Sequence, residues 1–555
     1  MSNFASKNRK HIIMSNTIGF SNFRRFTSFP EIDLGDITIL VGGNNAGKST
    51  LVKAMLLMRD FLKSRIESVD KTENIFQTIK PQFKFDAEHV NVGEFYRAFC
   101  RQSPSNEDTM SFSMKIDKFH FVVSIRGERK PGVVPEVSMI TVTDEDRDIT
   151  FKFDFSTNQM TVHFSYDRKA LNSDIKVNLL NEEAKLESRL KELESKLSKC
   201  KDLEKITAIK VDIERTQREL DRIHTKIKVD EQSNIGYSID EYDSVTIGLS
   251  FFIGDNIGEY VITELINGFV NYAYTGTTGD KRSKEYKEQI TNKSFLKGKE
   301  TEIKAVAKEI ENVLNRQTIE YIYAHSVSQT PFFANCIGSS DYTKRTIHEF
   351  YNSRISSGDE NLGIPKDNEF ILIENWLKEF KIGNSLKIQS YAGDSYQVLI
   401  IDEDNPDGID LADKGMGSIQ LAILLLRLAT LIRKYRGQDL TVLLEEPEQN
   451  LHPAIQSMLA DLVHDINKNF GVQFIIETHS EYLVRKSQVI VGRQYDSEEK
   501  AKENPFRIYY LPQSGLTYSI GYTLNGRLTE KFEPGFFDEA GKSNFYLMRK
   551  ERGLE

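Results

Sequence analysis

The chain carries Gly42-Gly43-Asn44-Asn45-Ala46-Gly47-Lys48-Ser49-Thr50, which matches the phosphate-binding pattern G-x-x-x-x-G-K-[ST]. Residues 37–41 form a mostly apolar run that predicts a buried strand before the loop. Apolar residues recur through 51–58 and predict a helix with one apolar face after it. Because the motif needs a strand on one side and a helix on the other, its setting supports a P-loop and an α/β fold.

Each part of this loop has a chemical task. Glycines let the backbone N–H groups turn toward a triphosphate, and the helix N-terminus adds the positive end of its dipole. The ammonium group of Lys48 reaches the β- and γ-phosphates, while the hydroxyl of Ser49 can ligate Mg²⁺. We therefore predict ATP and Mg²⁺ as cofactors, with nucleotide-binding residues Gly42, Asn44, Asn45, Ala46, Gly47, Lys48, Ser49 and Thr50.

Composition limits the other classes of function. The net charge of −9 over 555 residues argues against a generally basic nucleic-acid coat. Three scattered cysteines, with no pair at metal-ligand spacing and no secretory leader, predict a cytoplasmic protein. The longest apolar run, 421–432, is short for a membrane span and carries Arg427, so we expect a core helix and no membrane contact.

The other half of an ATP site lies far downstream. Residues 440–444 form a buried-strand pattern that ends in Glu445 and Glu446, and a carboxylate at such a strand end can hold Mg²⁺ while its neighbour orients water. We assign Glu445 to the metal and Glu446 to the water. A second apolar strand, 473–476, leads to His479, which we predict to contact the γ-phosphate.

Between these strands, residues 411–420 place Gly415, Gly417 and Ser418 directly before the apolar helix. Such a helix N-terminus is a second anion-binding feature, although a plain glycine-rich cap is the alternative. At this point the sequence resembles ABC-type ATPases of the SMC, RecF and OLD kind, whose signature segment caps ATP held by the opposite protomer. The resemblance implies a head-to-tail homodimer, with higher oligomers left open. Ser418 is favoured as the signature serine, while Ala412 and Gly415 stay open.

Further segments narrow the resemblance. Residues 446–453, with Thr478-His479-Ser480, look like the OLD-like branch, and residues 535–540 look like the C-terminal segment of DUF3696-type members. The chain is most similar to the PtuA ATPase family of Septu and retron-associated anti-phage systems. That resemblance implies a separate HNH nuclease as partner, and a reverse transcriptase, retron nucleic acid or phage DNA as further partners.

The middle of the chain predicts two insertions. Apolar residues at spacings of three and four run through 186–200 and, in a new phase, through 206–227. This predicts a coiled coil, either a helical hairpin turning near 199–202 or one long helix with a discontinuity. Alternating residues in 112–123 and 151–155 predict an antiparallel β side lobe. We expect an N-terminal ATPase lobe over 1–175, the coil over 176–230, a mixed region over 231–395 and a C-terminal ATPase lobe over 396–555.

Nuclease chemistry has no clear residue set in the sequence. The spacing of Asp402-Glu403-Asp404 is that of a two-metal site, but Asn405-Pro406-Asp407-Gly408 follows and predicts a hairpin turn. The hypothesis is therefore an ATPase that regulates a nuclease and does not cut. An SMC/RecF-like DNA-repair or tethering ATPase and a self-contained OLD-like nuclease are the alternatives.

Overall fold

The computed structural model describes residues 16–65, 81–87, 90–166, 168–199, 203–232, 241–248, 259–267, 300–323, 333–334, 341–359, 362–391 and 395–551. At its centre lies a six-stranded sheet in the order β12-β17-β18-β3-β19-β20, parallel except for β20. Its strands are β12 (Gln317–Ile322), β17 (Asp439–Glu445), β18 (Gln473–Thr478), β3 (Ile37–Gly42), β19 (Phe506–Leu511) and β20 (Tyr518–Ile520). Strands from both ends of the chain thus form one head, as the sequence predicts.

Both faces of this sheet are covered, which explains why its strands are continuously apolar. Leu40 and Leu443 face one core, shared with the side lobe, whereas Ile39 and Val442 face a second core built mainly with helices. Alternate residues of each strand therefore serve different cores, as the two-residue period of a strand requires. The helices of the second core are α8 (Tyr342–Asn352), α9 (Asn368–Glu379), α10 (Met416–Lys434), α11 (Pro453–Phe470) and α12 (Glu481–Gln494).

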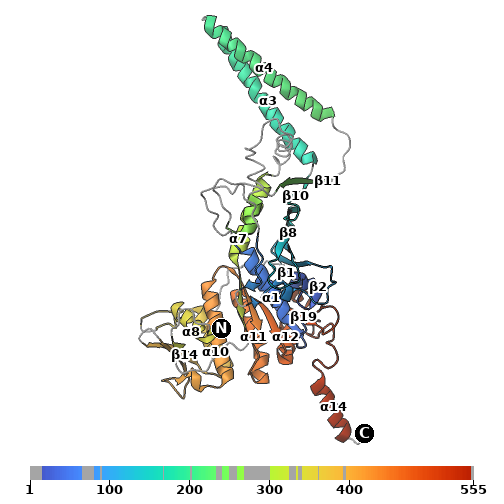
Figure 1. The fold of residues 1–555 in the computed structure, drawn as a ribbon. Helices are drawn as coiled ribbons and strands as arrows, with labels where there is room; N and C mark the ends of the chain where they lie inside the picture. Colours follow the sequence, from blue (N-terminus) through green and yellow to red (C-terminus); the bar gives the residue numbers. More distant parts are fainter. Residues whose placement is uncertain are drawn as a thin grey trace.

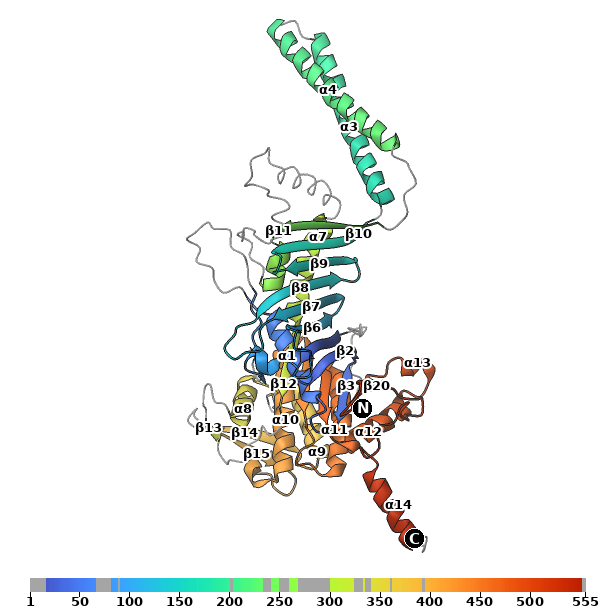
Figure 2. The ribbon, with the colours of Figure 1, turned by 45° about the vertical axis from the view of Figure 1, so that its right-hand side comes forward.

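The side lobe is an eight-stranded antiparallel sheet that rises above the head (Figure 2). Its order is β11 (Glu241–Gly248), β10 (Gln159–Tyr166), β9 (Ile149–Asp154), β8 (Glu136–Asp144), β7 (Phe119–Arg126), β6 (Thr109–Ile116), β1 (Asn16–Phe23) and β2 (Phe26–Leu34). The predicted lobe is confirmed, but it is larger than the alternation in 112–123 and 151–155 indicates. Strand β11 lies in the region 231–395, which the sequence predicts to be mixed. It belongs to the side lobe because it pairs with β10 at the base of the inserted helices.

The insertion between β10 and β11 consists of α3 (Arg168–Lys199) and α4 (Leu203–Gln232), which pack along each other. Figure 1 shows the pair projecting away from the head. His224 Nε2 on α4 lies 2.5 Å from Glu183 Oε1 near the middle of α3, which joins the two helices. Of the two alternatives, the helical hairpin is correct and the single long helix is wrong.

A smaller sheet and several short helices complete the head. The sheet contains β13 (Phe333–Ala334), β15 (Ser395–Ile401), β14 (Ser385–Tyr391) and β16 (Ile409–Asp410). Because β15 and β16 pair antiparallel, the segment Asp402-Glu403-Asp404 begins their connecting turn, as predicted. The short elements are β4 (Asp86–Ala87), β5 (Val90–Asn91), α2 (Phe95–Ala98), η1 (Leu411–Asp413) and α13 (Glu498–Ala501).

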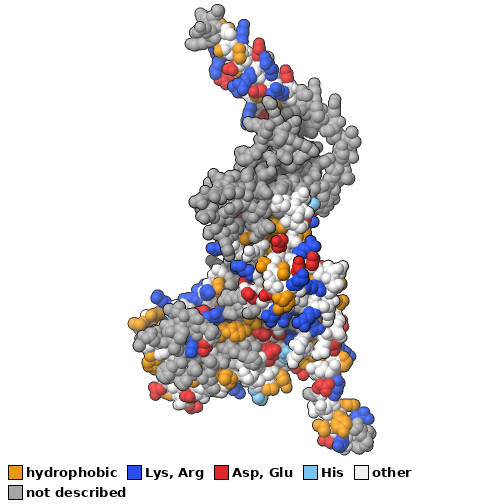
Figure 3. All heavy atoms as spheres, viewed as in Figure 1, with side chains coloured by type: hydrophobic (Ala, Val, Ile, Leu, Met, Phe, Trp, Pro, Cys, Tyr) orange, Lys and Arg blue, Asp and Glu red, His pale blue; other side chains and the backbone are white. Residues whose placement is uncertain are grey.

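Two helices differ in how much of their apolar surface is buried. Helix α10 has the length and apolar composition of a membrane span, yet 72% of its most apolar window is buried inside the protein, so the predicted core helix is confirmed. At the other extreme, α14 (Glu539–Glu551) leaves the head near the C-terminus and exposes the apolar side chains Phe545, Tyr546, Leu547 and Met548. Figure 3 shows these hydrophobic atoms gathered on the projecting end.

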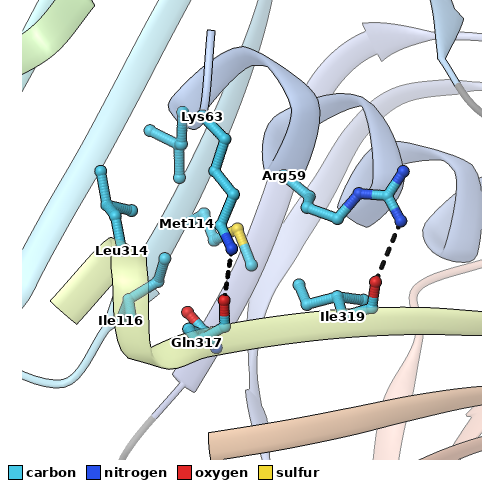
Figure 4. A pocket seen from close by; sticks show the side chains of 8 residues that line it. Arg59, Lys63, Met114, Ile116, Leu314, Gln317 and Ile319 are labelled. Atoms are coloured by element: carbon cyan, nitrogen blue, oxygen red, sulfur yellow. Dashed lines mark hydrogen bonds between the residues drawn. The ribbon is translucent and has the colours of Figure 1, made fainter. Parts of the chain in front are cut away.

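The P-loop helix α1 (Lys48–Leu62) is tied to β12 at its far end. Lys63 Nζ donates to the carbonyl of Gln317 over 2.5 Å, and Arg59 Nη1 donates to the carbonyl of Ile319 over 3.0 Å (Figure 4). Helix α7 (Glu300–Arg316) leads directly into this strand and is held to the side lobe by the ion pair of Glu309 with Arg147. Strand β12 is therefore connected both to the P-loop helix α1, through these hydrogen bonds, and to the side lobe, through α7.

Candidate nucleotide and magnesium site

The P-loop has the backbone geometry that its sequence predicts. Strand β3 ends at Gly42, and α1 begins at Lys48 after Gly47, whose φ of 106° is left-handed. A side chain at Gly47 would also collide with the ring of Phe26, so both conformation and space require glycine there. Asn44 and Asn45 are exposed at the loop tip, while Ala46 is buried and anchors the loop in the core.

Lys48 lies at the centre of the site with only 3% of its surface exposed. Its Nζ donates to the carbonyls of Gly42 and Gly43 over 2.9 and 3.2 Å, and lies 3.0 Å from Nε2 of His479. Burial lowers the pKa of Lys48, an effect that Glu477 and other nearby carboxylates oppose. Because an ammonium group has three hydrogens, a phosphate must displace one of these partners, and His479 is the one on a side chain.

His479 acts as an acceptor in this arrangement. Burial, and then the charge of Lys48, lower its pKa, so the imidazole is neutral at neutral pH. Its Nε2 also lies 3.4 Å from Oε1 of Glu446. One nitrogen cannot accept from Lys48 and donate to Glu446 together, and since Lys48 can only donate, the bond to Lys48 is the one formed. The predicted P-loop lysine, the water-orienting glutamate and the histidine predicted to contact the γ-phosphate thus lie next to one another.

The backbone around the two predicted glutamates is unusual at Glu446. Its φ is +41°, which is rare for a residue with a side chain, and its N–H donates to the carbonyl of Glu477 over 2.8 Å. This left-handed step turns the Glu446 side chain toward His479, while the Nε2 of Gln449 donates to its carboxylate. Glu445, in turn, accepts a hydrogen bond from the hydroxyl of Tyr321 on β12. Burial and that bond raise the pKa of Tyr321, so its phenol stays protonated.

Two further glutamates belong to the site, although the sequence reasoning gave them no role. Glu448 is 7% exposed and accepts from Thr478 Oγ1 and from the backbone N–H of His479, both over 2.7 Å, which holds the histidine segment in place. Glu477 is 3% exposed and accepts from Ser49 Oγ over 2.8 Å. Burial raises the pKa of Glu477 to about 7. Glu448 lies two residues after Glu446, and Glu477 lies two residues before His479. This closeness to predicted site residues was the signal that the sequence offered.

Arg25 is another residue that sequence reasoning missed. From the turn between β1 and β2, its guanidinium donates to the carbonyl of Asn45 in the P-loop and, over 2.5 Å, to the carbonyl of Gln513. The side lobe thus reaches the tip of the phosphate-binding loop. A single arginine in an N-terminal segment gives no local pattern that would identify this contact.

The predicted signature residues lie at the start of α10. Gly415 is the N-cap and is exposed, and the N–H of Ser418 donates to the carbonyl of Gly415 over 2.8 Å. Gly417 packs against the backbone of Asn450, and Gln420 Nε2 donates to the carbonyl of Pro447 over 3.1 Å. The segment therefore sits directly behind the loop that follows Glu446. Among the described residues, no hydrogen bond joins it to the P-loop of its own chain.

The donor set suits a magnesium ion. Ser49, Glu445 and Glu477 offer only oxygen atoms, which Mg²⁺ prefers, and Oε2 of Glu477 is buried without a hydrogen-bond partner among the described residues. In the part of the chain that the structure describes, no group of three or more His, Cys, Asp or Glu is arranged to hold a metal. The ion would therefore need the serine and the nucleotide phosphates to complete its ligands, as is usual for Mg²⁺ at such sites.

Comparison with known proteins gives a family. No curated protein matches the chain. Among solved structures, it is similar to the Smc head domain with an extended coiled coil, bound to the C-terminal domain of ScpA, from Pyrococcus furiosus, at 11% identity over 97% of this chain and 98% of that one, with a TM-score of 0.32. It is also similar to the Smc head domain with a coiled coil and joint from Pyrococcus yayanosii, at 11% identity over 93% and 98%, with a TM-score of 0.30. The sequence model of the AAA ATPase domain matches residues 14–484, most of the chain, and the protein therefore belongs to the AAA ATPase domain family.

Proposed function

We propose that this ATPase works as a head-to-tail homodimer around two ATP·Mg²⁺ and that its ATP cycle controls a separate nuclease in anti-phage defence. The observation that carries the proposal is the meeting of Lys48, Glu446 and His479 in one site, with Lys48 bonded to His479 over 3.0 Å. This arrangement can bind a triphosphate and also respond to its hydrolysis. A site that only binds nucleotide would need neither Glu446 nor the bond between Lys48 and His479.

Each residue of the site has a separate role in ATP binding and hydrolysis. Lys48 exchanges its bond with His479 for a phosphate oxygen, and the released imidazole, with its proton on Nε2, can then donate to the γ-phosphate. Glu446 orients the attacking water and accepts its proton. Bound magnesium would supply charge neutralisation between the phosphates, and Ser49 and Glu445 are the predicted residues that would hold it.

The dimer follows from the signature segment. Gly415, Gly417 and Ser418 present a helix N-terminus at the surface, and such an end attracts anions. Since each chain has one P-loop, a free helix end of this kind fits the γ-phosphate bound by a second protomer. Ser418 would then supply its hydroxyl in trans.

The regulatory role rests on the resemblance to PtuA ATPases, in which an HNH nuclease is a separate subunit. A reverse transcriptase, retron nucleic acid or phage DNA is a further proposed partner that the ATPase would sense. In this chain, the segment Asp402-Glu403-Asp404 begins a β-turn in which Asp402 accepts from the N–H of Asn405 over 2.8 Å. The segment therefore has a structural role in the turn, which favours a regulator over a nuclease. The expected biochemical profile is ATP hydrolysis without cutting.

The test uses the full chain with Mg²⁺ or Mn²⁺. Purified protein should hydrolyse ATP and leave supercoiled and linear DNA intact, and isolation from its native operon should bring down a nuclease. Deleting residues 181–228 would show whether the hairpin holds that partner. Metal-dependent cutting by the lone chain, lost on changing Asp402 and Asp404 but retained in Lys48→Ala, would instead identify a self-contained nuclease.

One observation favours a second candidate, a DNA-tethering ATPase of the SMC/RecF kind. The hairpin of α3 and α4 projects from the head (Figure 1), and such an arm could embrace a DNA duplex together with the dimerised heads. That function predicts ATP-dependent retention of closed-circular DNA by the protein alone. Retention that needs the nuclease subunit would favour the regulatory role.

A further inference from the structure

We infer that Glu477 is a magnesium-site residue of this ATPase, so that the cation is held by two carboxylates, Glu477 and Glu445, together with Ser49. The inference rests on the proposed ATP-dependent function and assigns one more residue to that site. It concerns a residue at the end of β18, a strand that sequence reasoning used only to place His479.

Strand order puts Glu477 closer to the P-loop than Glu445. Strand β18 lies between β17 and β3, so its last residues are the direct neighbours of the loop that follows β3. The register pairs Glu477 with Leu40 on one side and with Glu445 on the other. The two carboxylates thus leave adjacent parallel strands at the same level, and Glu477 is the one bonded to Ser49 Oγ, over 2.8 Å.

One carboxylate oxygen of Glu477 lacks a hydrogen-bond partner in the part of the chain that the structure describes. Oε1 accepts from Ser49, but Oε2 is buried and lacks a hydrogen-bond partner among the described residues, in a side chain with 3% exposure. Leaving a buried carboxylate oxygen without a partner is costly. A cation next to Ser49 would complete this oxygen, and the serine could still donate its proton to Oε1.

The charges around Glu477 point the same way. Glu445 and Glu446 both act on Glu477 electrostatically, which adds negative charge beside it, while Lys48 and Lys53 interact with it as cations. A triphosphate adds more negative charge. A divalent cation is therefore needed for the phosphates to approach this cluster, and Mg²⁺ in nucleotide sites takes one or two carboxylates besides phosphate oxygens.

The experiment measures how Mg²⁺ changes nucleotide affinity, independently of turnover. A fluorescent, non-hydrolysable ATP analogue is titrated into the full-length protein at a series of Mg²⁺ concentrations and in EDTA, and Mn²⁺ binding is followed by electron paramagnetic resonance. In Glu477→Gln the amide oxygen can still accept from Ser49 while the charge is lost. We expect its half-saturating Mg²⁺ or Mn²⁺ concentration to rise about 10- to 100-fold, with affinity in EDTA unchanged or higher.

Glu448→Gln is the matched control, because Glu448 is also buried, at 7% exposure, with an unpartnered Oε2, but bonds Thr478 and the His479 N–H rather than Ser49. Its metal dependence should stay within about two-fold of wild type, whatever its turnover, because outer-shell effects on metal affinity act through hydrogen bonds to the ligands and Glu448 bonds Thr478 and the His479 N–H instead. Glu477→Asp, which keeps the charge, should recover part of the loss. Equal loss of nucleotide binding in EDTA in the Gln and Asp variants would assign Glu477 to packing.

The outcomes separate the two proposals. If wild-type protein shows no Mg²⁺-dependent nucleotide binding, the proposed function itself fails. If wild type binds but Glu477→Gln has the wild-type metal dependence, only the role of Glu477 is refuted. Should Glu477→Gln not fold, the Asp variant decides: wild-type behaviour on Mn²⁺ at the shorter side chain would overturn metal ligation, and a weakened Mn²⁺ signal with retained ATP binding in EDTA would support it.

Discussion

Replacing Lys48 with alanine tests the site most directly. Lys48 is 3% exposed, and its ammonium group contacts the carbonyls of Gly42 and Gly43 and the imidazole of His479. A phosphate takes the place of the histidine, so the change removes a charge-assisted contact that exists only in the complex. It also leaves the phosphates facing the carboxylates of the site without their central cation.

The size of the effect follows from these contacts. A hydrogen bond to a charged group contributes about 1.5–3 kcal/mol. Two unit charges about 4 Å apart interact by roughly 4 kcal/mol at the effective dielectric of a protein surface, which sets an upper bound. We therefore expect a loss of about 2–4 kcal/mol in the free energy of binding, or roughly a 30- to 700-fold weaker Kd for MgATP.

Isothermal titration calorimetry with MgATP measures this loss, and thermal unfolding without nucleotide checks the fold. Lys63→Ala is the control, because Lys63 follows the last turn of the same helix, where it donates to the carbonyl of Gln317. That variant can lose stability but should bind MgATP within about two-fold of wild type, since Lys63 makes no charge-assisted contact with the phosphates. If Lys48→Ala also binds within about three-fold, far below the loss of a charged hydrogen bond, the P-loop assignment is refuted.

Three other changes test separate parts of the molecule. Glu446→Gln should keep MgATP binding and lower kcat by about 10²- to 10⁴-fold, so that ATP is trapped; turnover close to wild type would mean that another group is the base. Lys48→Ala and Ser418→Arg chains, each inactive alone, should regain ATPase activity when mixed dimers form, and no gain would count against a shared site. Arg147 lowers the pKa of Glu309 to about 2, so this partly exposed pair stabilises the fold by about 1–2 kcal/mol above pH 4.5 and loses that contribution as pH falls toward 2. Glu309→Gln should flatten this part of the acid-unfolding curve, and an unchanged curve would contradict the assignment.

Several features of the head could be predicted from sequence because their causes are local. The P-loop follows from glycines that permit one backbone path and from the apolar strand before it, 37–41. The strands that lead to Glu445 and His479 are apolar throughout because both faces of a parallel sheet are buried. Helix α10 was recognised as a core helix from the length of its apolar run and the presence of Arg427, whose guanidinium pairs with Glu320 over 3.1 Å.

The remaining features depend on neighbours that are distant in sequence. Strands β1 and β2 join the side lobe through β6, and β11 joins it only after the chain returns from the hairpin. Tyr321 reaches Glu445 because α1 and β17 hold β12 in place. No local pattern encodes these pairings.

The sequence by itself determined that this protein binds a nucleoside triphosphate, because a short stretch of backbone and one lysine specify that chemistry locally. Only the tertiary structure decided which acidic groups surround the nucleotide. Ser49 and Glu477 are 428 positions apart, and their hydrogen bond exists because β18 lies between β17 and β3 in the sheet. A carboxylate at the end of an apolar strand looks the same in sequence whatever lies beside it, and only strand order places it next to the P-loop serine.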